Sequence, residues 1–158
     1  MRNVLLLALS MVVLTPAAAA AARGPAVWAT VNVCDTAAKP NTLGVRGSMP
    51  GLKRKTTLRM RFRVQYLASD GRWLIVRRNA DSRWQKVGTR RGGRVESGWS
   101  FTFARPSKPV TLRGVVRFRW RRGDALPRSA EVATEAGHRS SAGADPAGYS
   151  AATCVLGS

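Results

Sequence analysis

Hydrophobic and polar residues alternate along much of this chain, and the alternation is clearest in two long segments. In residues 56–67, apolar side chains fill the even positions from 58 to 66, whereas arginine or glutamine fills the odd positions between them. Residues 110–121 have apolar residues or glycine at the even positions and mostly arginine at the odd ones. Successive side chains of a β-strand point to opposite faces of the sheet, so each segment predicts a long strand with one buried face.

Shorter segments with a similar pattern predict further strands. They cover residues 26–34, 43–49, 72–77, 84–88, 97–104, 126–136 and 149–156. A polar turn is expected at residues 35–41 and a loop of small, polar residues at 137–148. About eight short strands separated by such turns are typical of an all-β fold, and we predict a single antiparallel β-sandwich of the immunoglobulin or fibronectin III kind. A small β-barrel is the alternative.

The N-terminal segment has the three parts of a secretory signal peptide. A start with one cation, Arg2, precedes an apolar run over residues 4–14, and Pro16 and a series of alanines follow. The apolar run is about half of the roughly 20 residues that a spanning helix needs. We expect cleavage after Ala22, which gives a helical signal peptide, residues 1–22, and an exported domain, residues 23–158. An uncleaved N-terminal anchor is the alternative.

The chain has two cysteines, Cys34 and Cys154, near opposite ends of the exported domain. An even number of cysteines in an exported protein favours a disulfide, and this one would tie the first strand to the C-terminus. A closed loop of this length would stabilise the fold by about 4–5 kcal/mol, through its effect on the unfolded chain. Two free thiols are the alternative.

The net charge says more about the class of partner than the rest of the composition does. The full chain has a net charge of +19 at pH 7, and removing the signal peptide takes away only one cation, Arg2. Arginine supplies most of this charge, which is the usage of a high-GC genome, but codon usage does not explain why acidic residues are few. A charge of this size attracts polyanions such as anionic lipid, wall polymers or nucleic acid.

The arginines of the two long segments lie at alternate positions, so each set occupies one face of its strand. If the two strands are central neighbours in one sheet, both sets share one outer surface. Guanidinium groups match carboxylate and phosphate, so we hypothesise an anion-binding face. Its residues are Arg59, Arg61, Arg63, Arg113, Arg117, Arg119 and Arg121. The alternative is the ordinary polar outer face that any sandwich sheet needs.

The sequence offers little for catalysis. Its one histidine, His138, lies in the predicted polar loop, so we expect it to be solvated rather than held as the base of a catalytic triad. Most acidic residues fall in predicted turns, where aspartate bonds to the backbone. Two cysteines and one histidine are too few for a closed zinc site. We therefore predict no enzyme, no metal and no cofactor.

Five tryptophans raise the question of carbohydrate binding, because exposed aromatic rings stack on sugars. Trp120 falls on the apolar face of its strand, which favours the core. Trp73 and Trp84 border predicted loops and are the better candidates for exposure. Packing in the core or at its rim is the preferred interpretation for all five.

The chain also shows a general layout: a secretory leader, an early cysteine, a final cysteine in DPAGYSAATCVL and an arginine-striped strand in RGVVRFRWRRG. In this it resembles the small uncharacterised exported β-sandwich proteins of high-GC actinobacteria. The resemblance covers most of the chain. It implies a fold and a compartment, and it supplies no activity and no functional residues.

Together these features predict a secreted or cell-surface domain that is not an enzyme and that binds an anionic envelope polymer or membrane surface through its arginines. The alternative is a structural or accessory domain that binds another envelope protein, with charge serving solubility. A small hydrolase using His138 is a third hypothesis. Nucleic acid is disfavoured as a partner because the protein is exported.

Overall fold

The computed structural model describes residues 26–157 and is all-β over that range. The predicted signal peptide, residues 1–22, lies outside the described residues. Nine strands follow one another: β1 (Trp28–Thr36), β2 (Lys39–Pro50), β3 (Thr56–Leu67), β4 (Trp73–Ile75), β5 (Gln85–Arg90), β6 (Arg94–Thr102), β7 (Val110–Arg122), β8 (Ala125–Ala133) and β9 (Cys154–Leu156). The predicted all-β fold is confirmed.

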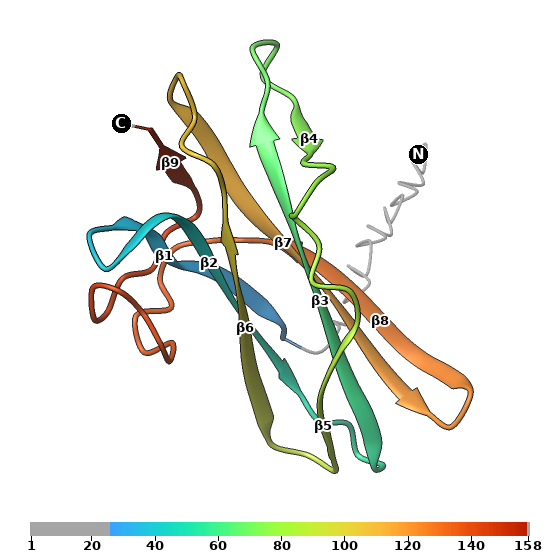
Figure 1. Cartoon of the computed structure of the whole chain (residues 1–158). Coiled ribbons are helices and arrows are strands. Elements are labelled where there is room, and N and C mark those ends of the chain that lie inside the picture. The colour runs from blue at the N-terminus through green and yellow to red at the C-terminus, as the bar shows by residue number, and fades with distance from the viewer. Residues whose placement is uncertain (1–25, 158) are drawn as a thin grey trace, which may run out of the picture.

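The strands form two antiparallel sheets that face each other (Figure 1). The smaller sheet has the order β1-β2-β6, and the larger has the order β4-β3-β7-β8. In the larger sheet, β5 pairs with the first part of β3, along the same edge as β4. Similarly, β9 pairs with the start of β7, along the same edge as β8. The first, second and sixth strands thus share one sheet and the third, seventh and eighth share the other, as in an immunoglobulin-like sandwich. Residues 26–157 form no closed barrel, so that alternative is wrong.

The core lies between the sheets and is built from the even positions of the two long strands. Their fully buried side chains are Leu58, Met60, Phe62 and Val64 of β3 and Val116, Phe118 and Trp120 of β7. The smaller sheet contributes Val31, Leu43, Val45 and Met49. Trp120 satisfies its one polar group inside the core, because its indole N–H donates to the carbonyl of Pro50 at 2.7 Å. Burial of each such large side chain contributes about 1.5–3 kcal/mol.

The disulfide predicted from the sequence is confirmed. Cys34 of β1 is bonded to Cys154 of β9, with their Cα atoms 5.4 Å apart. β1 belongs to the smaller sheet and β9 to the larger, so the bond joins the two sheets as well as the two ends of the domain.

Several strand boundaries differ from the prediction, among them those of β2, β8 and β9. β2 begins at Lys39 because the turn before it is tighter than expected: the Asp35 carboxylate accepts a hydrogen bond from the backbone N–H of Asn41 at 2.6 Å. β8 ends at Ala133, since the chain then leaves the larger sheet and the N–H of Glu135 donates to the carbonyl of Ala29 in β1. β9 covers only the last part of the predicted segment 149–156.

The loop before β9 packs on β1. Trp28 stacks on the ring of His138 with centroids 4.1 Å apart, and His138 Nε2 lies 3.0 Å from Glu135 Oε1. The Asn32 side chain donates to the carbonyls of Ala142 and Gly143. The prediction of a solvated histidine is therefore wrong, because the loop folds over the edge strand β1 and stacks His138 on Trp28. Among residues 26–157, no helix has the length and apolar character needed to cross a membrane.

Candidate anion-binding face

β3 and β7 are direct neighbours, as a shared arginine surface requires, and their register places arginines opposite each other. Arg59 lies opposite Arg119, and Arg61 lies opposite Arg117. Directly opposed side chains of an antiparallel pair point to the same face of the sheet. The even positions fill the core, so the odd positions point outward. We call this outer surface of β3 and β7 the arginine face.

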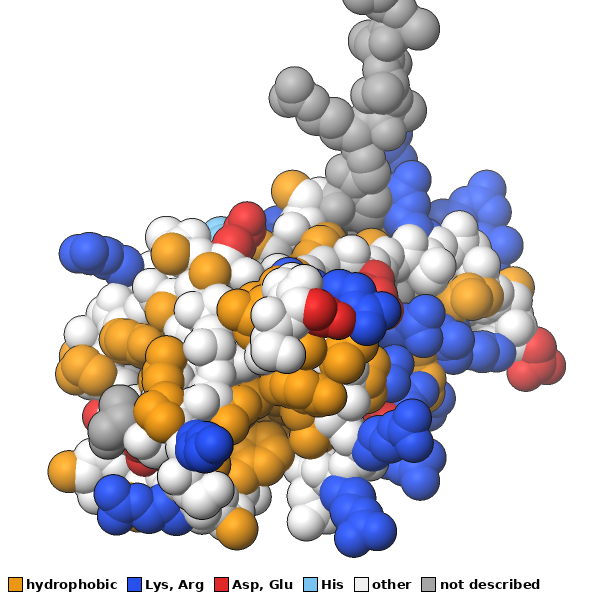
Figure 2. Space-filling model, turned by 90° about the horizontal axis from the view of Figure 1, so that it is seen from above, with side chains coloured by type: hydrophobic (Ala, Val, Ile, Leu, Met, Phe, Trp, Pro, Cys, Tyr) orange, Lys and Arg blue, Asp and Glu red, His pale blue; other side chains and the backbone are white. Residues whose placement is uncertain are grey.

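The other three arginines of the predicted set lie on the same surface. Arg63 is opposite Val115, Arg113 is opposite Gln65, and Arg121 is opposite Thr57. Val115 is the one odd position in this part of β7 that is buried, at 7% exposed. Seen from above, Lys and Arg side chains concentrate on the side of the molecule where β3 and β8 lie, whereas hydrophobic side chains gather in the middle (Figure 2).

Like charges placed directly opposite each other destabilise a sheet, so the arginine face needs compensation. Asp81 supplies part of it, because its carboxylate takes two hydrogen bonds from the Arg61 guanidinium. The backbone N–H of Arg83 also donates to Asp81, at 2.9 Å. The Arg61 hydrogen bond holds the pKa of Asp81 at about 2, below its ordinary 3.8, and the same pair raises the pKa of Arg61.

The connection between β4 and β5 positions Asp81. It runs beside β3 and continues the sheet hydrogen bonding, since the N–H of Val64 donates to the carbonyl of Ala80 and the N–H of Ser82 donates to the carbonyl of Phe62. This brings Asp81 to a position beside Arg63 and its neighbour Arg61.

A second carboxylate comes from the edge strand β8. Glu131 lies opposite Arg117 in the β7–β8 register, and its Oε2 is 2.5 Å from the Arg117 Nε. Both side chains are nearly half exposed, so the pair is screened by solvent and contributes little to stability. Together with Asp81, Glu131 neutralises the opposed pair of Arg61 and Arg117.

Two tryptophans hold two further guanidiniums. The Arg113 guanidinium lies 4.2 Å from the ring centroid of Trp73, and that of Arg119 lies 4.1 Å from the centroid of Trp84. Arg113 also donates from Nε to Gln65 Oε1 at 2.8 Å, and burial lowers its pKa. A guanidinium covers each half-buried ring on this side of the sheet, so neither ring offers a free indole face for stacking on a sugar.

Three arginines of the face have neither a carboxylate nor a tryptophan partner among residues 26–157: Arg59, Arg63 and Arg121. Arg121 instead donates to the backbone carbonyl of Asp124 at 2.8 Å. Lys86 of β5 lies opposite Arg59 and adds a cation to this end of the surface. The face as a whole therefore keeps a large excess of positive charge.

The sequence reasoning missed the partners of these arginines. Ser129 and Glu131 lie two positions apart in the predicted strand 126–136. The alternation of side chains along that strand could therefore have placed both on its outer face. Nothing in the sequence signals the position of Asp81, because it lies in a connection without a periodic pattern.

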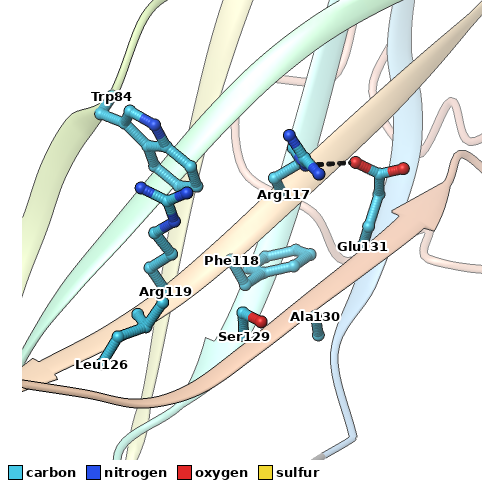
Figure 3. A pocket seen from close by; sticks show the side chains of 8 residues that line it. All are labelled: Trp84, Arg117, Phe118, Arg119, Leu126, Ser129, Ala130 and Glu131. Atoms are coloured by element: carbon cyan, nitrogen blue, oxygen red, sulfur yellow. Dashed lines mark ion pairs between the residues drawn. The ribbon is translucent and has the colours of Figure 1, made fainter.

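A shallow hollow lies on the arginine face over β7 and β8 (Figure 3). Its volume is about 190 Å³, and its walls include Trp84, Arg117, Arg119, Ser129 and Glu131. In the part of the chain that the structure describes, no group of three or more His, Cys, Asp and Glu side chains is arranged to hold a metal ion.

Comparison with known protein families and with curated proteins finds no match for this chain.

Proposed function

We propose that this protein is an exported, non-enzymatic domain that binds an anionic polymer or surface of the cell envelope through the arginine face. The observation that carries the proposal is the register of β3 and β7, which sets Arg59 against Arg119 and Arg61 against Arg117. Seven guanidiniums share this surface with only two paired carboxylates, those of Asp81 and Glu131.

This arrangement has an energetic consequence. Opposed like charges raise the free energy of the folded protein, and a polyanion that binds across the rows lowers it again. Solubility alone would be served as well by arginines scattered over both sheets. Guanidinium groups also bind carboxylate and phosphate through paired N–H donors, which a general positive field does not require.

Part of the face is held in place before any ligand arrives. Trp73 and Trp84 fix the guanidiniums of Arg113 and Arg119, and Gln65 adds a hydrogen bond to Arg113. Side chains that are already ordered lose less conformational entropy on binding, which favours affinity. Export supports an envelope partner, since an exported protein meets wall polymers and anionic lipid first.

The test is the retention of the purified exported domain on immobilised dextran sulfate, a generic polyanion, across a salt gradient. The variant Arg59→Ser/Arg63→Ser/Arg121→Ser removes the arginines that have neither a carboxylate nor a tryptophan partner. A control, Lys39→Ser/Arg105→Ser/Arg139→Ser, removes the same charge from exposed positions outside β3 and β7.

We expect the first variant to elute at clearly lower salt than the control, because binding through the face should depend on these three side chains and weaken as salt screens them. Elution of both variants at the same salt concentration would contradict the proposal, since retention would then follow total charge. Thermal unfolding of each variant checks that both remain folded.

A further inference from the structure

The hollow over β7 and β8 has two different walls. On one side the Arg119 guanidinium lies over the Trp84 ring, and on the other Arg117 is paired with Glu131 (Figure 3). Ser129 lies opposite Arg119 in the β7–β8 register and places its hydroxyl between these walls. Leu126, 44% exposed, adds an apolar surface at the edge of the hollow.

The hydrogen-bonding capacity of these walls is mixed. Arg119 can only donate, Glu131 as a carboxylate can only accept, and Ser129 can do both. A ligand with acceptors alone, such as a polyphosphate, would satisfy Arg119 but would meet the negative charge of Glu131. A ligand that satisfies the whole set carries an anionic group and, a short distance away, hydroxyl groups that donate.

The size of the hollow limits the ligand further. Its volume of about 190 Å³ is smaller than the roughly 300–1,000 Å³ of pockets that enclose drug-sized molecules. It is open to the surface and lies on an edge strand, so it suits one unit of a longer chain rather than a separate small molecule.

We infer that this hollow is a subsite for one uronic acid unit of an acidic polysaccharide. The sugar carboxylate lies on the fork of Arg119, ring hydroxyls donate to Glu131 and exchange a hydrogen bond with Ser129, and the C–H face of the ring contacts Leu126. The inference rests on the proposed function and narrows its ligand from any polyanion to a glycan that bears carboxylates.

The experiment compares two soluble probes of equal charge, an oligogalacturonate and a linear polyphosphate, by isothermal titration calorimetry at one salt concentration. For the native protein we expect at least about tenfold tighter binding of the oligogalacturonate. The variant Glu131→Gln loses a charged acceptor and frees Arg117. It should therefore bind polyphosphate more tightly, and its preference for oligogalacturonate should fall by about tenfold, as expected when a hydrogen bond to a charged group is lost.

Glu96→Gln is the matched control, because Glu96 also lies 4.0 Å from an arginine, Arg46, but on the smaller sheet. It makes the same change in net charge and should leave the preference unchanged. Ser129→Ala, at an exposed position, should weaken oligogalacturonate binding several-fold.

Equal affinity of the native protein for both probes, or the same preference in Glu131→Gln and Glu96→Gln, would overturn the uronate subsite. The proposed function would still stand if the variant lacking Arg59, Arg63 and Arg121 lost binding to both probes. Failure of the native protein to bind either probe would overturn both proposals.

Discussion

At the scale of single residues, the arginine face shows how a sheet tolerates opposed cations. Each of the two central rows has its own form of compensation. Arg61 and Arg117 lie opposite each other and each meets a carboxylate, whereas Arg119, opposite Arg59, lies on an indole ring. A cation over an aromatic face gains about 0.5–2 kcal/mol without losing its charge. The compensation therefore stabilises the face while leaving much of its positive charge available.

The Arg61–Asp81 pair makes stability depend on pH in a defined range. The pKa of Asp81 is about 2 in the folded protein and about 3.8 when unperturbed, so folding favours its ionised form. The stabilisation is complete above about pH 4 and is lost as the pH falls through about 2, where the folded protein also binds the proton. The shift corresponds to about 2 kcal/mol, and partial exposure of both side chains reduces this to about 1 kcal/mol.

We therefore expect Asp81→Asn to lower the free energy of unfolding by about 1 kcal/mol at pH 7, and the deficit to shrink as the pH falls from 4 to 2. Urea unfolding monitored by tryptophan fluorescence at several pH values measures this deficit in the free energy of unfolding. Asp124→Asn, in an exposed turn, is the control and should have little effect at any pH. A deficit that stays constant down to pH 2 would show that the ion pair is not its source.

At the scale of elements, alternation along the sequence was enough to predict β3 and β7 and the face that each buries. The reason is physical: a strand with one buried face must alternate, and a shift by one residue would bury a row of arginines. Alternation also identified the seven arginines as a set. It did not specify that the strands are neighbours, which depends on pairing between residues roughly 45–65 positions apart in the sequence.

Apart from Ser129 and Glu131, whose outward position the alternation of their strand indicates, the rest of the candidate site depends on contacts that no local pattern encodes. Asp81 contacts Arg61 because an irregular connection hydrogen-bonds to β3. Trp84, the residue just before β5, lies against Arg119. The stacking of Trp28 on His138 likewise joins β1 to a loop more than 100 residues away. Each contact is set by tertiary packing, which overrides the propensity of the segment concerned.

One position in β7 shows how closely the sheets approach. Gly114 lies under Val45 of β2, and a Cβ atom there would be 2.7 Å from both methyl carbons of that valine and 2.8 Å from the methyl of Thr134. Its backbone is also fixed, because its N–H donates to Thr134 Oγ1 and its carbonyl accepts from the Thr134 N–H. The strand cannot move away without losing these bonds.

Gly114→Ala should therefore lower the free energy of unfolding by about 1–3 kcal/mol, the usual effect of overfilling a packed core. Gly88→Ala is the control: the added Cβ would meet Val95 at an ordinary 3.5 Å, so its effect should stay within about 0.5 kcal/mol. Guanidinium chloride unfolding of the two variants distinguishes them. Equal stability of both would mean that the sheets separate easily at this point.

At the scale of the whole molecule, charge and cross-linking are related. A net charge of +19 over the full chain opposes compaction through self-repulsion. The Cys34–Cys154 bond counters this repulsion independently of any ligand, because it joins β1 of one sheet to β9 of the other across 120 residues of sequence. The domain can thus stay folded with its arginine face unoccupied.

The double variant Cys34→Ser/Cys154→Ser measures this contribution. Closing a loop of 120 residues removes chain entropy from the unfolded state, and we expect its loss to lower the free energy of unfolding by about 4–5 kcal/mol. Urea unfolding at high salt, where charge repulsion is screened, gives this value most directly.

At low salt the variant should be less stable still, and dextran sulfate should restore part of the difference, because a ligand that binds only the folded state stabilises it. If dextran sulfate stabilised the variant no more at low salt than at high salt, repulsion within the arginine face would not be what the polyanion relieves.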